Sequence, residues 1–348
     1  MQQMSCKKYP IGTPGGVIAL PSLLTAENTA DSWPRMRRDI LSRLSYAMGM
    51  PPADVPLRAE VCSERCVDGI AVRTILLDTF DADRVRCLLL LPPHTETDGQ
   101  RHPAILALHP TDTDYADSLL LSRPGSTEDY PYALELARAG YVVLAPDVFT
   151  RQYNPEARTI DDSYDTALFE SRRPEWSTVG RMLGDHRLAL RYLLSLPCVD
   201  GDRLGTIGHS LGGTNAMVLA AMDARIKAVA VSCCLGAFCC HHNVRVWCRE
   251  KGFCYFPQLK STISAGYVPF EWFELIAAAS PRPYFIFQTK NDRWFPRWDG
   301  AVQSVERAAE AYALQKAQQN LVLQLADGPH CFPRKAREAA YAFLRERL

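Results

Sequence analysis

The sequence predicts an α/β fold in which a mainly parallel sheet is covered by helices on both faces. Short apolar runs alternate with amphipathic stretches from residue 92 to residue 348, which is the pattern of strand-helix units. Several of these runs are almost continuously apolar, as strands buried on both faces are. With 348 residues, 47% of them hydrophobic, the chain can bury one large core that carries appendages.

The N-terminal part predicts a helical arm followed by an antiparallel start to the sheet. Pro34 suits a first helical turn, and apolar residues recur at helical spacing from there to Met48, before Pro51 and Pro52 end the pattern. Runs at 57–61, 70–77 and 85–91 have strand character. We therefore expect a helical arm over residues 1–56 and the main α/β domain over residues 57–348.

The rest of the chain predicts alternating elements with two interruptions. We expect strands at 104–108, 141–145, 203–207, 226–231, 284–287 and 321–325, and helices at 132–139, 179–196, 211–221, 270–279, 301–319 and 335–348. Segments 147–177 and 233–273 lack a sustained period. Long irregular segments of a compact domain are often functional, and we expect 233–273 to form a pocket wall or lid.

Composition excludes several classes of partner. The 39 basic and 39 acidic residues cancel, so there is no net field to hold nucleic acid. No run of eighteen apolar residues predicts a membrane span, and proline and glycine interrupt the best signal-like stretch, 11–24. Twelve unevenly spaced cysteines in a chain of this length favour reduced thiols and a cytoplasmic protein.

The strongest local signal is Gly208-His209-Ser210-Leu211-Gly212. The motif follows the strand-like run 203–207 and opens the helical stretch 211–221. A Gly-x-Ser-x-Gly motif in that context predicts a sharp turn that lifts the serine hydroxyl above the sheet. The alternative is a glycine-rich turn that only caps a helix. The strand-turn-helix context favours Ser210 as a nucleophile.

A serine nucleophile needs a base, and the base needs an acid. His330 follows the last expected strand, 321–325, where a histidine could reach across the sheet. Asp292 follows the expected strand 284–287, although aspartate is also common in turns. We assign His330 as the base and Asp292 as the acid, with Asp299 and Asp327 as reserve acids.

Two backbone N–H groups are expected to stabilise the oxyanion. The residue after the nucleophile, Leu211, supplies one. His109-Pro110-Thr111 follows the strand 104–108, and the N–H of Thr111 is the second candidate because proline has none. We expect a structural role for His109 itself.

On these motifs the sequence resembles the α/β-hydrolase superfamily over residues 57–348, with the chain order Ser210, Asp292, His330. It looks most like the dienelactone-hydrolase and acetyl-xylan-esterase-like group, on the His109-Pro110 strand end and the runs 199–205 and 279–283. Dienelactone hydrolases have cysteine where Ser210 stands, so the resemblance implies an ester hydrolase instead, with an acetyl esterase as one candidate. Pro110 stands where many members have glycine.

We therefore expect a serine-dependent carboxylic ester hydrolase that acts on a small-molecule ester and requires no cofactor. The same triad would also serve a peptidase or amidase. A catalytically silent binding protein with the hydrolase fold is the alternative from another class. Neither the acyl nor the alcohol specificity follows from the triad.

Segment 233–254 is rich in cysteine and histidine, so a zinc site has to be weighed. The spacing Cys234-x4-Cys239 is at the long limit for zinc knuckles and Cys248-x5-Cys254 exceeds it. Because free cysteines also behave as small hydrophobes, we expect no metal there. The aromatic residues of 247–273 favour a pocket wall, and we expect Trp272 to line it.

Overall fold

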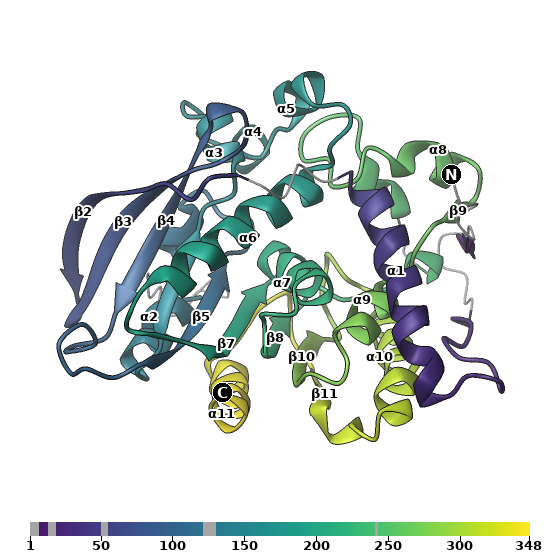
Figure 1. Cartoon of the computed structure of the whole chain (residues 1–348). Coiled ribbons are helices and arrows are strands. Elements are labelled where there is room, and N and C mark those ends of the chain that lie inside the picture. The colour runs from purple at the N-terminus through teal and green to yellow at the C-terminus, as the bar shows by residue number, and fades with distance from the viewer. Residues whose placement is uncertain (1–6, 13–18, 50–54, 121–129, 241–242) are drawn as a thin grey trace.

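A computed structural model describes residues 7–12, 19–49, 55–120, 130–240 and 243–348. Its nine-stranded sheet has the order β2-β3-β4-β6-β5-β7-β8-β10-β11 (Figure 1). The first four strands in this order pair antiparallel, and all pairs from β6 onward are parallel. This confirms the predicted mainly parallel sheet with an antiparallel start. The strands are β2 (Ala59–Val67), β3 (Ile70–Asp78), β4 (Arg84–Leu91), β5 (His102–Leu108), β6 (Val142–Pro146), β7 (Val199–His209), β8 (Ala228–Ser232), β10 (Tyr284–Thr289) and β11 (Leu321–Ala326).

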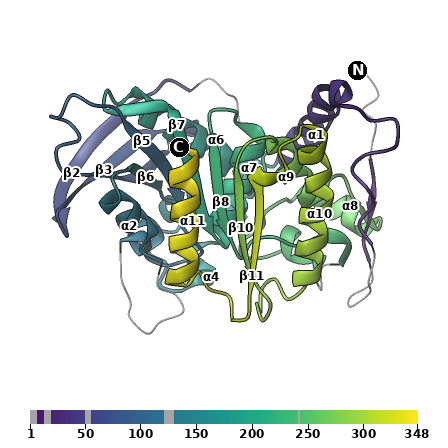
Figure 2. The same cartoon turned by 90° about the horizontal axis from the view of Figure 1, so that it is seen from below.

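Helices cover both faces of the sheet, as predicted. Along β5, Ala104, Leu106 and Leu108 join the apolar core on one face, whereas Ile105 and Ala107 join the core on the other, which is the period-two alternation of a strand. In Figure 2 α2 and α11 lie in front of the sheet, and α6 and α7 lie behind it. The larger helices are α1 (Trp33–Met48), α2 (Tyr132–Arg138), α6 (Thr178–Ser195), α7 (Leu211–Met222), α9 (Trp272–Ala279), α10 (Trp298–Leu314) and α11 (Arg334–Arg347).

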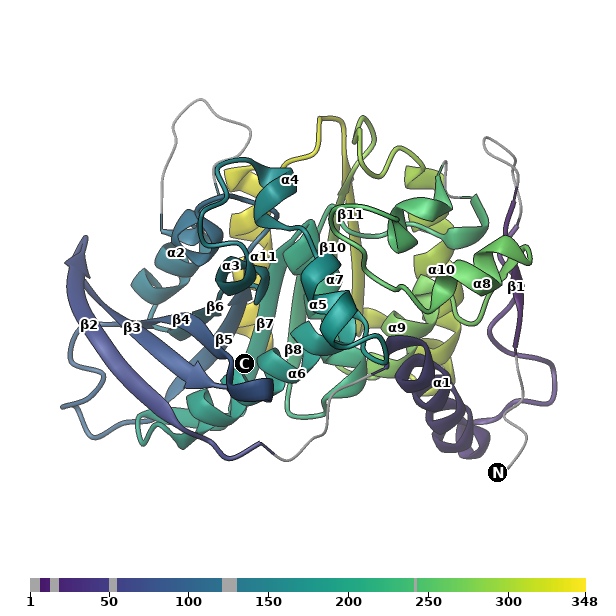
Figure 3. The same cartoon turned by 90° about the horizontal axis from the view of Figure 1, so that it is seen from above.

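Two regions differ from the sequence prediction. Strand β2 continues to Val67, six residues beyond the predicted end, because it is an exposed edge strand whose side chains show no buried face. Segment 147–177 contains three short helices, which Figure 3 shows between the β2–β4 end of the sheet and α1. They are α3 (Thr150–Tyr153), α4 (Ile160–Ser163) and α5 (Ala167–Arg172).

A second small sheet and a short helix lie at the N-terminal side of the molecule. Strand β1 (Tyr9–Pro10) pairs antiparallel with β9 (Tyr267–Val268), and α8 (Leu259–Ser264) precedes β9. Within the described ranges, none of the helices combines the length and the apolar character that a membrane span requires.

A buried ion pair joins α1 to the main domain. The guanidinium of Arg43 donates to both carboxylate oxygens of Glu274 on α9, at 2.6 and 2.9 Å, and also to the carbonyl of Pro269. The Arg43 side chain is 4% exposed and that of Glu274 is 0% exposed. Both charges are therefore compensated by each other rather than by water.

Loss of one partner of this pair should destabilise the protein. Arg43→Ala leaves the carboxylate of Glu274 buried without its cation, and we expect a loss of about 3 to 5 kcal/mol in the free energy of unfolding. Urea unfolding followed by circular dichroism measures it. Arg35→Ala on the same helix removes an exposed arginine and should change stability by at most about 0.5 kcal/mol. Equal effects of the two variants would contradict this account.

Candidate active site

Ser210 lies at the sharp turn between β7 and α7. Its backbone has φ 54° and ψ −119°, a conformation that costs a non-glycine residue about 1–3 kcal/mol. A Cβ on Gly208 would come within 2.2 Å of the Gly212 carbonyl oxygen, and a Cβ on Gly212 within 1.9 Å of the Leu108 carbonyl oxygen. Only glycine therefore fits on either side of the strained serine. The Ser210 N–H donates to the Ser232 carbonyl at 2.8 Å, which ties the turn to β8.

His330 and Asp292 meet at the carboxyl ends of β10 and β11. The distance from His330 Nδ1 to Asp292 Oδ2 is 2.7 Å. The other carboxylate oxygen, Oδ1, accepts the N–H groups of Trp294 at 2.8 Å and Phe295 at 2.9 Å. The Asp292 side chain is fully buried and that of His330 is 12% exposed. A buried carboxylate held by three donors fixes the orientation and tautomer of the imidazole.

The reserve acids have other partners. The Asp299 carboxylate pairs with Arg297 at 2.7 Å, and the pKa of Asp299 is held below its ordinary value by these hydrogen bonds. Asp327 is 82% exposed at its side chain and lies 3.5 Å from the Lys290 ammonium. The structure thus brings Asp292 to His330, rather than Asp299 or Asp327.

Leu211 and Thr111 lie on the same cavity as Ser210, as an oxyanion hole requires. Leu211 is the first residue of α7, so its N–H has no acceptor within the helix. His109 is buried beside them and has structural partners: Nε2 accepts the Val148 N–H at 3.1 Å, and Nδ1 lies 2.6 Å from the Pro110 carbonyl oxygen. Burial lowers the pKa of His109, which keeps the ring neutral for both contacts.

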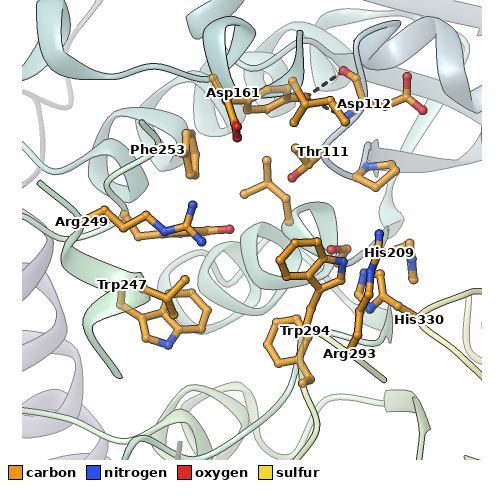
Figure 4. Close-up of a pocket in the computed structure, with 18 of the residues that line it drawn as sticks. Thr111, Asp112, Asp161, His209, Trp247, Arg249, Phe253, Arg293, Trp294 and His330 are labelled. Atoms are coloured by element: carbon orange, nitrogen blue, oxygen red, sulfur yellow. Dashed lines mark hydrogen bonds between the residues drawn. The ribbon is translucent and has the colours of Figure 1, made fainter. Parts of the chain in front are cut away.

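The cavity around Ser210 has a volume of about 240 Å³, and Figure 4 shows residues that line it. Three segments form its walls besides the catalytic turns. They are 110–112 after β5, 160–164 around α4, and 246–255 after β8, and Tyr130, just before α2, also lines the cavity. Its lining includes Tyr164, Trp247, Phe253, Tyr255, Arg249, Arg293, Trp294 and Phe295.

Segment 233–273 contributes to this wall through residues other than the expected one. Val246, Trp247, Arg249, Phe253 and Tyr255 line the cavity. Trp272 does not: it is 1% exposed and lies behind the wall, with its ring centroid 4.7 Å from that of Trp247. The density of aromatic residues indicated the wall, but it could not tell the facing tryptophan from the supporting one.

His209 is a site residue that the sequence motif did not single out. Its ring is fully buried, 4.8 Å from the ring of His330 and 4.6 Å from that of Tyr130, and its Nδ1 lies 3.0 Å from Ser232 Oγ. Burial lowers the pKa of His209 far below its ordinary value. The ring is therefore a neutral surface against which the imidazole of His330 packs.

The cysteine-rich segment has the character of a core in the part of the chain that the structure describes. Cys234, Cys239, Cys240, Cys248 and Cys254 are all buried among apolar residues, while His241 and His242 lie outside the described residues. One group with metal-ligand geometry occurs among the described residues, formed by Cys233, Asp292 and His330. Burial raises the pKa of Cys233 to about 12, so its thiol is protonated and a poor ligand at neutral pH.

The chain is similar in sequence and in fold to known hydrolases. A family model described as the dienelactone hydrolase family matches residues 128–233, which include the turn of residues 208–212 around Ser210, called the elbow below. Solved structures that superimpose on the chain include a glucuronoyl esterase from Solibacter usitatus, with a TM-score of 0.75, 18% identity, and 95% of this chain and 98% of that chain covered. The chain has the α/β-hydrolase fold.

Other relatives agree with that assignment. A structure described as a putative acetyl xylan esterase from Bacteroides fragilis matches this α/β-hydrolase fold with a TM-score of 0.66 and 17% identity, covering 95% of this chain and 92% of that chain. In sequence, the chain is 28% identical to the "Putative hydrolase YtaP" of Bacillus subtilis (strain 168) over 291 residues, which is 81% of this chain and 90% of that protein. The resemblance inferred from the motifs is confirmed.

The assignment of Asp292 can be tested against its reserve. Asp292→Asn should lower kcat on the order of 10³- to 10⁴-fold, because an amide at this position favours the wrong tautomer of His330. Asp299→Asn is the matched control, since Asp299 pairs with Arg297 instead, and it should stay within a few-fold of wild type. Steady-state kinetics with an activated ester measures both. If Asp299→Asn is crippled and Asp292→Asn is mild, the assignment is wrong.

Proposed function

We propose that this protein is a serine-dependent carboxylic ester hydrolase that works through an acyl-enzyme intermediate. The observation that carries the proposal is the hydrogen bond of 2.7 Å between the buried carboxylate of Asp292 and His330, whose ring lines the same cavity as the strained residue Ser210. Nucleophile, base and acid come from the ends of β7, β11 and β10. The esterases among the similar structures support the choice of an ester over a peptide or amide bond.

The reaction follows from the roles of these groups. Ser210 Oγ attacks the acyl carbon while its proton passes to Nε2 of His330, and the N–H groups of Leu211 and Thr111 stabilise the oxyanion. Asp292 stabilises the imidazolium. The imidazolium then gives the proton to the leaving alcohol as the ester C–O bond breaks. Water, deprotonated by His330, attacks the acyl-enzyme, releasing the carboxylic acid and restoring Ser210.

The cavity favours an ester of a carbohydrate, with an acetyl group among the acyl groups to test. Trp247, Phe253 and Tyr255 form an aromatic wall, and Trp294, 52% exposed, also lines the cavity. Aromatic rings offer flat apolar faces beside polar edges, which suits the faces of sugar rings. Glucuronoyl and acetyl xylan esterases among the similar structures support this substrate class. A cytoplasmic location remains our proposal, supported by the burial of cysteines such as Cys87, Cys234 and Cys254 in the apolar core, where reduced thiols behave as small hydrophobic groups.

Loss of the nucleophile tests the proposal. Ser210→Ala should lower kcat for short-chain and carbohydrate esters by about 10⁴-fold or more, as expected when a triad nucleophile is removed. The folded state is checked by circular dichroism and by the melting temperature. Ser195→Ala, which removes a hydroxyl at the end of α6 that donates to the Tyr192 carbonyl and does not line the cavity, is the control for a general effect of losing a hydroxyl. Turnover near that of wild type by folded Ser210→Ala would overturn the mechanism.

The position of Trp247 in the cavity wall gives a second prediction. Trp247→Ala should change the preference among acyl or alcohol groups by roughly 1 to 3 kcal/mol, because it removes apolar contact with the bound substrate. Trp247→Phe keeps an aromatic face and should change the preference less. The measurement is the ratio of kcat/KM across a panel of ester chain lengths and acetylated sugars. An unchanged ratio in Trp247→Ala would show that this side chain does not contact substrate.

A further inference from the structure

The loop that carries the proposed oxyanion donor Thr111 is held on both sides of that residue. Thr111 lines the cavity, and among the described residues none accepts a hydrogen bond from its N–H. Its neighbours are engaged. On one side the carbonyl of Pro110 bonds to His109, and on the other side the backbone of Asp112 bonds to Tyr164. A free donor therefore lies between two fixed peptide groups.

His109 sets the direction of the Thr111 N–H. Because Nε2 of this neutral ring accepts the Val148 N–H, its proton is on Nδ1, which donates to the Pro110 carbonyl at 2.6 Å. The Pro110 carbonyl and the Thr111 N–H belong to one planar trans peptide group, in which they point in opposite directions. The Thr111 N–H is therefore turned away from the His109 ring.

Tyr164 fixes the loop on the other side of Thr111. Its hydroxyl accepts the Asp112 N–H and donates to the Asp112 carbonyl, each at 3.1 Å, and Figure 4 marks contact at Asp112 with a dashed line. The same carbonyl accepts the Tyr115 N–H at 3.1 Å, which closes a turn. Tyr164 is 2% exposed, so water does not compete for these bonds. One buried hydroxyl thus holds both backbone polar groups of the residue after Thr111.

Tyr115 completes the connection from the opposite direction. Its hydroxyl donates to the carbonyl of Ser163 at 2.8 Å, and its ring stacks on that of Tyr164, with centroids 5.3 Å apart and planes at 12°. Tyr115 has φ 52°, a conformation that a non-glycine residue keeps only where its surroundings hold it. Reciprocal hydrogen bonds of these two tyrosines therefore join the loop 110–115 after β5 to the segment 160–164 around α4.

We propose, on the basis of the ester hydrolase function above, that Tyr164 is a positioning residue of the oxyanion hole, supported by Tyr115. Its hydroxyl holds the backbone of Asp112 so that the N–H of Thr111 stays directed at the oxyanion. The single O–H donor of Tyr164 is used by the Asp112 carbonyl, so Tyr164 acts through the backbone and not on the substrate. An oxyanion hole is effective because its donors are aligned before the reaction begins.

Tyr164→Phe tests this role, because it removes the hydroxyl and keeps the ring. The kcat for 4-nitrophenyl acetate should fall about 10- to 100-fold, less than the roughly 10²- to 10³-fold loss when an oxyanion donor is removed outright. KM should stay within about threefold of wild type, since the ring that lines the cavity remains. Circular dichroism and the melting temperature check the folded state.

Tyr153→Phe is the matched control for the loss of a tyrosine hydroxyl. Tyr153 belongs to α3 in the same part of the chain, and its hydroxyl donates to the Asp83 carboxylate at 2.9 Å. It does not line the cavity and has no bond to the loop 110–115. Both kcat and KM of Tyr153→Phe should therefore stay near those of wild type.

A second measurement separates support of the oxyanion hole from a general structural role. Ser210 Oγ adds to the carbonyl carbon of a trifluoromethyl ketone, its proton passes to His330, and the ketone oxygen becomes an oxyanion. The affinity of Tyr164→Phe for this ketone should fall by about the same factor as kcat/KM, because both depend on the stabilised oxyanion. The affinity for the corresponding alcohol, which forms no oxyanion, should be unchanged. If Tyr164→Phe does not fold, Tyr115→Phe takes its place in both measurements, with the same expected direction.

Failure of this inference differs from failure of the proposed function. A folded Tyr164→Phe with kcat near that of an active wild type would overturn the positioning role and leave the esterase standing. A lower kcat or a higher KM without loss of ketone affinity would also overturn it, since the hydroxyl would then act on something other than the oxyanion. Absence of turnover of any ester by the wild-type protein would instead count against the esterase.

Discussion

The carboxylate of Asp292 is the interaction on which most of the site depends. One oxygen orients His330, and the other fixes the backbone N–H groups of Trp294 and Phe295. Because the group is fully buried, these hydrogen bonds are not weakened by competition with water. The same carboxylate thus sets the geometry of the base and that of the turn carrying Arg293 and Trp294. In the proposed enzyme, both proton transfer by His330 and the cavity wall at Trp294 therefore depend on the Asp292 carboxylate.

The elbow supplies the second constraint, because it has to hold a non-glycine residue in a strained conformation. Ser210 has a positive φ, and the glycines at 208 and 212 are required by backbone contacts that leave no room for a Cβ. The contact at Gly208 is with Gly212 inside the motif, whereas the contact at Gly212 is with Leu108 on β5. Both demand glycine, which is why a five-residue motif was enough to predict the turn. The positions of Asp292 and His330 could be predicted equally well. Asp292 follows the buried strand β10 and His330 follows the half-buried edge strand β11, and the apolar run of each strand is clear in the sequence.

The features that the sequence missed depend on contacts between distant segments. Strand β2 is exposed on both sides, so no alternation marked its full length. Trp247 and Trp272 belong to one cluster of aromatic rings, and only the packing of the segment after β8 decides which of them faces the cavity. His209 occupies the variable position of the motif, and its contact with His330 forms only when β11 lies beside β10. Likewise, Arg249 and Arg293 line one cavity although 44 residues separate them in the chain.

The central claim is that Ser210 is the activated nucleophile of an intact triad. The most direct measurement is the reaction of the wild-type protein with a fluorophosphonate probe, followed by peptide mapping of the labelled residue by mass spectrometry. The account predicts one adduct per chain, on Ser210, with labelling strongly slowed when His330 is replaced by alanine. A protein that is not labelled, or is labelled at another residue at the same rate with and without His330, would contradict it.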